Sequence, residues 1–410
     1  MSPERAQALR TLVDAWLAQH GVAATGDVDV LRAEVVRPGR PGLLDIVARV
    51  GDRRAHLVAG LRSVGDEPHF LRAGDEAALG LLEDEHGLAV CSDALRDAQL
   101  GPLLLADIRG VQARPGPVAV RRDNDEVTVL DCGDRGDLLV FPWLDVGPRP
   151  SVDLMVALDE AGFNHIAAPL ARWVWDGTDL GVVQEPLADR SSGWALALTS
   201  LRDLYASGVA PEAAGADFGP EAHALGTMTG RMHLALDQAF SRHPEPVAAW
   251  VDAGEEAIAA ADPSLLDAPG VSDLLKSLRA TEARLPVLRT HGDFHLGRTA
   301  RTDQGWVVSD CTPGGVLPGA SEPGRRSPLA DVADLLWSMH QASVTAEAER
   351  DPTGRQGLDS LGQAWEARNR RAFVAGYLGT RGIAGLTGPD RDLVRHLVAF
   401  FELARSVRPA

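Results

Sequence analysis

The feature that most constrains the fold of this chain is a change of texture about halfway along it. Residues 31–112 and 118–184 carry short runs of Val, Leu and Ile separated by Gly, Pro and Asp, which is the pattern of β-strands and turns. Residues 76–85 are an exception in the first of these stretches and are predicted to form a short helix. From residue 192 onward, longer segments with helical spacing of apolar residues dominate. A strand-rich part followed by a helix-rich part predicts an α+β protein.

The length of 410 residues predicts two or three domains. We place an N-terminal subdomain at residues 1–113, a strand-rich lobe at residues 114–189 and a helical lobe at residues 190–410. The Pro- and Gly-containing stretch at residues 114–117 is the predicted linker between the first two. Near the start of the sequence, Ser2 is a favoured helix cap and Pro3 a favoured first helical residue, so a helix is expected to begin at Pro3.

Charge and composition narrow the class of protein. The formal net charge of −18 argues against binding to nucleic acid or to an anionic membrane, both of which call for a basic surface. Three cysteines are too few and too scattered for a disulfide framework. No signal-peptide pattern and no apolar run of membrane-spanning length is found, so a cytoplasmic location is expected.

Lys276 is the single lysine of the chain, and its other basic residues are arginines. A coding bias toward arginine explains this composition. It has a chemical consequence all the same, because any step that needs a lysine depends on Lys276 alone.

The segment with the clearest chemical content runs from Thr290 to Gly297 and contains His291, Asp293 and His295. A short apolar strand follows it and leads to Asp310. Two carboxylates in this arrangement suit phosphoryl transfer, in which one orients the acceptor hydroxyl and the other holds the magnesium ion that binds the phosphates. A lone His-Gly-Asp is common in turns, but His-Gly-Asp-x-His followed by a strand and Asp is more specific.

With this segment in place, the chain resembles the maltokinases, which are relatives of the aminoglycoside phosphotransferases, and the actinobacterial glucosamine kinases. The similar stretches follow the family order over nearly the whole chain, at residues 14–19, 159–167, 183–185, 192–194, 225–236, 290–297 and 326–336. The resemblance implies a bilobal protein-kinase-like fold with an N-terminal cap subdomain. It also implies transfer of the γ-phosphate of ATP to a hydroxyl of a sugar or an amino sugar.

The resemblance assigns roles to residues of the catalytic loop. Asp293 corresponds to the catalytic base, with His295 beside it in the same loop. Asp310 corresponds to the magnesium ligand. His291 and Asp331 correspond to residues that brace the loop.

The resemblance also implies the binding partners. ATP and magnesium are the expected cofactors, with the backbone at Gln184 and Glu185 next to the adenine. A small sugar is the expected acceptor, and a protein partner from sugar metabolism is conceivable by analogy.

The nucleotide side departs from the family pattern in a strand and in a turn. In the strand, Val140 stands where the family has a phosphate-binding lysine, and Asp153 stands where the family has the helical glutamate that orients this lysine. The turn that cradles phosphates in relatives contains Glu126 in an Asn-Asp-Glu sequence, and its carboxylates repel a triphosphate.

Two further departures affect the metal site. Arg298 replaces a metal-binding amide, and Thr312 replaces a second metal-binding acid. Losing one pre-organised electrostatic contact typically slows a reaction by about 10²–10³-fold. A guanidinium beside Asp310 is able to supply part of the missing positive charge. Two hypotheses therefore stay open, a divergent sugar kinase and a catalytically dead pseudokinase that binds or regulates.

Overall fold

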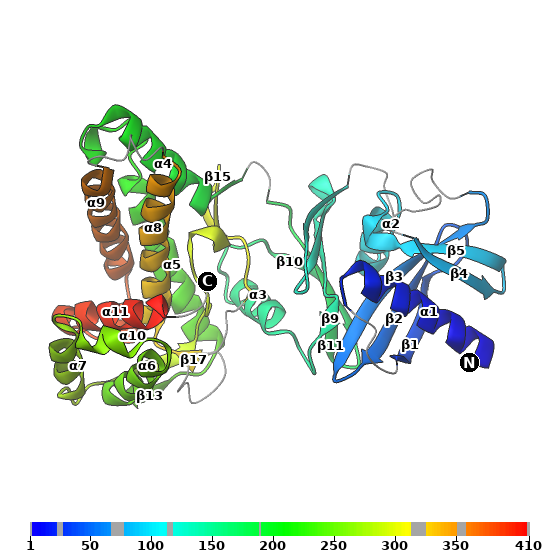
Figure 1. Cartoon of the computed structure of the whole chain (residues 1–410), viewed down its shortest axis with the longest axis horizontal. Helices are drawn as coiled ribbons and strands as arrows, with labels where there is room; N and C mark the ends of the chain where they lie inside the picture. Colours follow the sequence, from blue (N-terminus) through cyan, green and yellow to red (C-terminus); the bar gives the residue numbers. More distant parts are fainter. Residues whose placement is uncertain are drawn as a thin grey trace. The chain divides into compact units, whose positions relative to one another are not determined.

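A computed structural model describes residues 2–22, 28–66, 78–112, 118–187, 190–312, 325–350 and 358–407. The chain forms two compact units (Figure 1). Unit 1 comprises Met1–Asp153 and Ala168–Ala188, and unit 2 comprises Leu154–Ala167 and Asp189–Ala410. Unit 1 is mostly strand and unit 2 mostly helix, which confirms the predicted α+β class. The predicted linker at residues 114–117 lies outside the described residues.

The first sheet of unit 1 has the strand order β1-β2-β3-β5-β4, with β9 beside β3. Its members are β1 (Val28–Arg37), β2 (Gly42–Val50), β3 (Arg53–Ser63), β4 (Ala78–Asp84), β5 (Gly87–Asp93) and β9 (Trp143–Leu144). Helix α1 (Pro3–Gln19) shares an apolar core with this sheet through Leu12 and Trp16. As predicted, the helix begins at Pro3 and Ser2 caps it, accepting the Arg5 N–H at 3.2 Å.

The prediction of a helix at residues 76–85 is wrong, because residues 78–84 form strand β4. This strand pairs with β5 through a tight turn in which Gly87 has a φ of +90°. Leu79 and Leu82 are buried in the core shared with α1. Three residues apart, they fit a helical period as well as a bulged strand, and the register shift near the start of β4 explains the ambiguity.

The second sheet of unit 1 has the order β10-β11-β8-β7-β6. Its strands are β6 (Ala119–Asp123), β7 (Thr128–Asp131), β8 (Asp137–Val140), β10 (Pro169–Trp175) and β11 (Thr178–Gln184). One face packs against α2 (Leu100–Arg109), where Leu100 and Leu104 meet Leu138 and Val140 in an apolar cluster.

Unit 2 is built mainly from helices that pack against one another. They are α4 (Gly193–Ser207), α5 (Gly219–Ala239), α6 (Val247–Ala261), α7 (Val271–Arg279), α8 (Pro328–Ala348), α9 (Leu358–Gly379), α10 (Ala384–Thr387) and α11 (Arg391–Ser406). Helix α3 (Pro150–Glu160) begins in unit 1 and ends in unit 2. Helices α5 and α9 approach closely because glycines face the opposing backbone. A Cβ at Gly226 would overlap with the carbonyl oxygen of Phe373, and one at Gly376 would overlap with that of His223.

Two small sheets of unit 2 position the predicted catalytic loop. One contains β12 (Ser191–Ser192), β15 (Thr299–Thr302) and β16 (Gly305–Val308), and the other contains β13 (His243–Pro246), β14 (Arg284–Arg289) and β17 (Arg325–Arg326). The loop connects β14 to β15, and β16 leads to Asp310.

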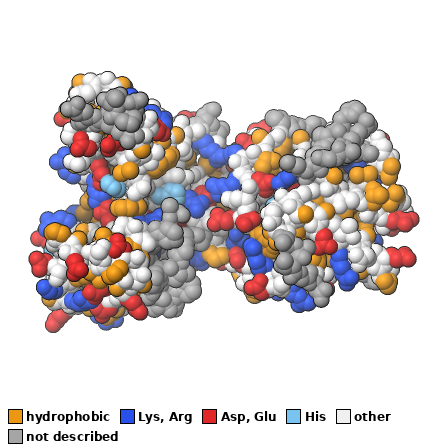
Figure 2. All heavy atoms as spheres, viewed as in Figure 1, with side chains coloured by type: hydrophobic (Ala, Val, Ile, Leu, Met, Phe, Trp, Pro, Cys, Tyr) orange, Lys and Arg blue, Asp and Glu red, His pale blue; other side chains and the backbone are white. Residues whose placement is uncertain are grey.

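The state of the cysteines and the apolarity of the helices bear on two expectations from the sequence. The three cysteines are buried and free, as expected for a chain without a disulfide framework. None of the helices in the described ranges is long and apolar enough to cross a membrane. Figure 2 shows acidic and basic side chains interspersed over the visible face of both units.

Candidate active site

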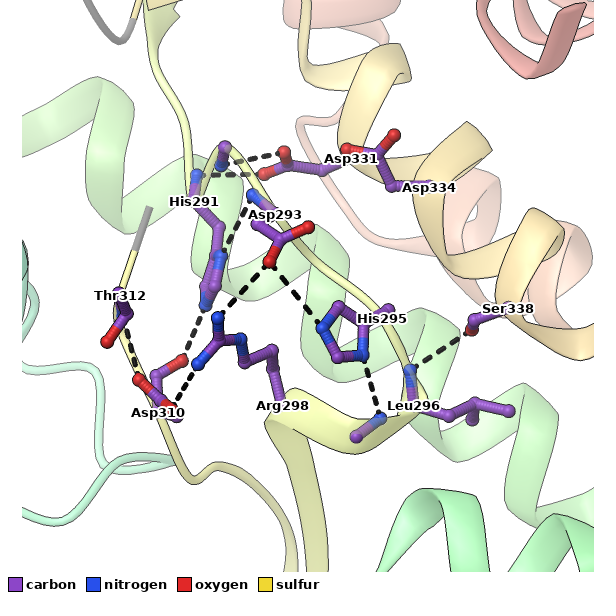
Figure 3. Close-up of polar contacts among 12 residues, drawn as sticks. His291, Asp293, His295, Leu296, Arg298, Asp310, Thr312, Asp331, Asp334 and Ser338 are labelled. Carbon is purple, nitrogen blue, oxygen red and sulfur yellow. Dashed lines mark hydrogen bonds and ion pairs between the residues drawn. The ribbon is translucent and has the colours of Figure 1, made fainter. Parts of the chain in front are cut away.

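The candidate catalytic loop is fixed to helix α8 by the carboxylate of Asp331 (Figure 3). This side chain is fully buried and accepts the backbone N–H groups of His291 at 2.9 Å and of Gly292 at 3.1 Å. Gly292 has a φ of +91°, a conformation that side-chain-bearing residues rarely adopt. The carboxylate and the glycine together hold the tight turn that presents the residues after it.

The Asp331 carboxylate is itself neutralised by a buried network. Arg326 donates to Asp331 and, at 2.6 Å, to Asp334, while His233 Nε2 lies 3.2 Å from Asp331. Burial raises the pKa of Asp331, but the charge of Arg326 and the contact with His233 outweigh burial and hold the pKa well below its usual range. The carboxylate therefore stays ionised. The other ring nitrogen of His233 contacts the buried hydroxyl of Tyr377 at 2.9 Å.

The imidazole of His291 links the backbones of the two candidate catalytic carboxylates. Its Nε2 donates to the carbonyl oxygen of Asp310 at 2.8 Å, and its Nδ1 accepts the N–H of Asp293 at 3.4 Å. Burial lowers the pKa of His291, in keeping with a neutral ring that donates on one side and accepts on the other. One side chain thus sets the spacing of Asp293 and Asp310.

The carboxylate of Asp293 lies between two cationic or hydrogen-bonding groups. Its Oδ2 is 3.6 Å from His295 Nε2 and 3.2 Å from Arg298 Nη2. Burial alone raises the pKa of Asp293, but contacts with His295 and Arg298 outweigh it and hold this pKa well below its usual range. His295 Nδ1 accepts the Gly297 N–H at 3.1 Å, which orients the ring.

A further anchor of the loop was missed by sequence reasoning. Ser338 on α8 accepts the backbone N–H of Leu296 through its hydroxyl at 3.0 Å. Ser338 lies seven residues after Asp331, two helical turns on, so both residues face the loop. That spacing was the available signal.

Arg298 occupies the space between the two candidate catalytic carboxylates (Figure 3). Its Nη1 donates to Asp310 Oδ2, and its Nη2 donates to Asp293. Burial lowers the pKa of the Arg298 guanidinium, but Asp310 and Asp293 outweigh it, so the pKa is raised and the group stays charged. The other oxygen of Asp310 accepts the N–H of Thr312 at 2.9 Å. Within the described residues, Arg298 Nε is buried and has no hydrogen-bond partner.

These residues do not fit a magnesium ion. Magnesium needs several oxygen ligands in octahedral geometry, and carboxylates supply its protein charge. Here Asp310 already pairs with a guanidinium, and Thr312 offers only a neutral hydroxyl. Among the residues that the structure describes, no group of three His, Cys, Asp or Glu side chains is placed to hold a metal ion.

On the nucleotide side, Val140 is buried in the apolar cluster that faces α2. The opposite face of the same sheet carries Arg172, which pairs with Asp179 at 2.8 Å and lies 3.4 Å from Asp153. The sequence predicted that Asp153 has no lysine to orient. In the structure, Arg172 of β10 lies next to Asp153 instead.

An arginine bonds to the backbone of the acidic turn between β6 and β7. Asn124 Oδ1 accepts the N–H groups of Glu126 and Val127, both at 3.0 Å, which fixes the turn. Arg149 donates to the carbonyl oxygen of Glu126 at 3.1 Å and lies 4.2 Å above the ring of Phe141. A positive charge therefore lies next to this turn.

The predicted adenine-contacting residues lie at the end of β11. Gln184 is buried, and its side chain bonds to Asp137. The N–H of Glu185 donates to the carbonyl oxygen of Ala168 at 2.8 Å, so this N–H already has a partner. Contact of this backbone with adenine stays a prediction.

Comparison with known proteins finds glucosamine kinases among the similar sequences. No family model matches the chain. A glucosamine kinase of Mycolicibacterium smegmatis is 26% identical over 284 residues, which cover 64% of this chain and 66% of that enzyme, just under two thirds of its length. A glucosamine kinase of Streptacidiphilus jiangxiensis is 27% identical over 382 residues, covering 87% of this chain and 76% of the relative.

Solved structures show the same fold. A glucosamine kinase in complex with glucosamine, ADP and inorganic phosphate aligns over 100% of this chain and 94% of its own, with a TM-score of 0.68 and 21% identity. Crystal form B of a glucosamine kinase aligns over 93% of this chain with a TM-score of 0.64. These comparisons show that the chain is similar to glucosamine kinases in sequence and that it has a kinase-like fold.

Proposed function

We propose that the protein transfers the γ-phosphate of ATP to a hydroxyl of a sugar or an amino sugar, with glucosamine as the first candidate. The observation that carries this proposal is that Asp293 and Asp310 lie on either side of one cation. Asp293 is on the loop that Asp331 braces, and His291 of the same loop bonds to the backbone of Asp310. The curated relatives support the substrate class, since both are glucosamine kinases. A protein partner in sugar metabolism stays a prediction of the resemblance.

In this proposal Asp293 orients the acceptor hydroxyl and takes its proton as the phosphoryl group is transferred. Its carboxylate is ionised, because His295 and Arg298 hold its pKa low. His295 keeps the carboxylate facing the site through the 3.6 Å contact of Nε2.

Arg298 takes over part of the charge that a magnesium ion would supply. A guanidinium carries five N–H donors in a planar fork and binds phosphate oxygens in pairs. Arg298 lies at the carboxylate that the resemblance assigns to the metal, and its Nε has no partner among the described residues. We therefore propose nucleotide binding that does not depend on magnesium. Turnover is expected to be slow, because a single guanidinium replaces contacts worth about 10²–10³-fold each.

A second candidate function is anion or nucleotide binding without phosphoryl transfer. It is favoured by the same ion pairs, since Arg298 already neutralises the candidate base and the candidate metal ligand. A phosphate group would then bind in competition with these pairs.

The test is a transfer assay with ATP and a panel of glucosamine, glucose and maltose, in magnesium and in EDTA, with products identified by mass spectrometry. A phosphorylated sugar that forms in EDTA and is absent with Asp293→Asn supports the first proposal. Nucleotide binding without any product supports the second. If the protein binds no nucleotide and forms no product, both proposals are rejected.

A further inference from the structure

Unit 2 contains a groove between α9 and α11 that the proposed phosphoryl transfer does not use. Its volume is about 740 Å³, within the range of about 300–1,000 Å³ that is usual for small-molecule sites. It is lined by Leu336, Arg370, Arg371, Val374, Ala375, Leu378, Gly379, Arg391, Val394, Arg395, Val398, Ala399 and Glu402.

The floor of this groove is apolar. Helices α9 and α11 each pack against α8, and Leu336 of α8 lies at the bottom with Val394 and Val398 of α11, all of them buried. Ala375 on α9 and Ala399 on α11 are exposed along the walls, where larger side chains would fill the space. The groove is thus a consequence of small residues on two facing helices.

The rim of the groove is basic. Four arginines and one glutamate line it, in a chain whose net charge is −18. Arg370 is fixed by Glu402 at 2.6 Å, and Arg395 pairs with the exposed Asp392 at 3.1 Å. Arg371 donates through Nε to a backbone carbonyl of its own helix. An exposed ion pair such as Arg395–Asp392 contributes little and is easily exchanged for another anion.

The groove is separate from the candidate catalytic loop. On α8, Asp331 and Ser338 contact the loop. Leu336 lies five residues after Asp331, which is about 140° around the helix axis. A ligand on the groove floor therefore meets a different side of α8 from the one that braces the loop.

We propose that this groove binds a small amphiphilic anion, with an apolar chain on the floor and a carboxylate or phosphate group at the arginine rim. The apolar floor favours an apolar chain. Arg370 pairs with Glu366 and Glu402, and Arg395 pairs with Asp392, so Arg371 and Arg391 supply the positive charge that favours a negative head. A docked protein would bury about 800 Å² on each partner, whereas the volume of this groove is in the range of small-molecule sites.

Isothermal titration calorimetry with decanoate tests the proposal on the full-length protein, with 1-decanol and decyltrimethylammonium as probes of equal chain length. Decanoate is expected to bind at least fivefold more tightly than decanol, and the cation is expected not to bind. Ala375→Trp fills the groove and should weaken decanoate at least tenfold. Ala364→Trp, on the exposed surface of the same helix but outside the groove, should leave the affinity unchanged.

The charge of the rim is tested by Arg371→Gln and Arg395→Gln, each expected to weaken decanoate about threefold to fivefold, as for a partly exposed ion pair. Lys276→Gln removes an exposed positive charge elsewhere in unit 2 and should have no effect. The proposal is overturned if decanoate does not bind, if all three probes bind equally, or if Ala375→Trp and Ala364→Trp have equal effects. It is also overturned if the protein is a dimer that Ala375→Trp dissociates, because a second copy of the chain would then occupy the groove. None of these readouts depends on phosphoryl transfer.

Discussion

The buried carboxylate of Asp331 gives the most quantitative prediction of the structure. Replacing it by Asn keeps the shape but removes the charge and one of the two acceptor oxygens. The His291 and Gly292 N–H groups each use one of these oxygens, so one of them must lose its acceptor or face an NH₂ group. Arg326 loses one of its two carboxylates and keeps Asp334.

The size of the effect follows from these losses. Hydrogen bonds to charged groups contribute about 1.5–3 kcal/mol each, and breaking a fully buried ion pair costs about 3–5 kcal/mol. Because Arg326 keeps Asp334, we expect a loss near the lower end, about 3 kcal/mol. The free energy of opening measured by hydrogen exchange at the amides of His291 and Gly292 reports it locally, which avoids treating two units as one transition.

The pH dependence has a definite sign. The pKa of Asp331 is lower in the folded chain than in the unfolded one, so its stabilising effect is present above about pH 4 and is lost as the pH falls below this value. The difference between wild type and Asp331→Asn should therefore shrink in acid. Asp359→Asn, an exposed acid on α9, is the control and should match wild type. A difference below about 1 kcal/mol at neutral pH would refute the assigned role of Asp331.

Three further predictions concern single side chains. Asp293→Asn should abolish phosphate transfer while calorimetry still shows ATP binding, and an active variant would exclude Asp293 as the base. Gly226→Ala should destabilise unit 2 by about 1–3 kcal/mol in thermal denaturation, because its methyl group overlaps with the α9 backbone; an unchanged transition would show that α5 and α9 are free to separate. Val140→Lys should lower the melting temperature of unit 1 sharply, since an unpaired charge enters an apolar core. Leu139→Lys on the opposite, half-exposed face should be tolerated, and equal stability of the two variants would contradict the observed strand orientation.

Local sequence patterns predicted some elements of the fold and failed for others. Ser2 and Pro3 predicted the start of α1. The helical prediction at residues 76–85 failed, because the leucines of β4 stand three apart across a bulge and only pairing with β5 decides between strand and helix. Sequence periodicity contains no information on that pairing.

In the candidate site too, some residues were predicted from a local motif and others were not. Asp293, His295 and Asp310 were found from a local motif and its resemblance to kinases, and the charge of Arg298 beside Asp310 was anticipated. Ser338 was not, because it meets Leu296 across 42 residues of sequence. Such contacts depend on how α8 packs against the loop.

The central claim is that Arg298 stands in place of a metal ion in nucleotide binding. The direct test is calorimetric titration of ATP, in magnesium and in EDTA, with wild type and Arg298→Gln, which replaces the guanidinium by an amide. We expect wild type to bind ATP about equally in both buffers. We expect Arg298→Gln to bind ATP about 10–100-fold more weakly in EDTA, the equivalent of one charge-assisted contact of about 1.5–3 kcal/mol, and to regain affinity with magnesium. Binding by wild type that requires magnesium, or affinity in EDTA that survives Arg298→Gln, would contradict the proposed role of Arg298.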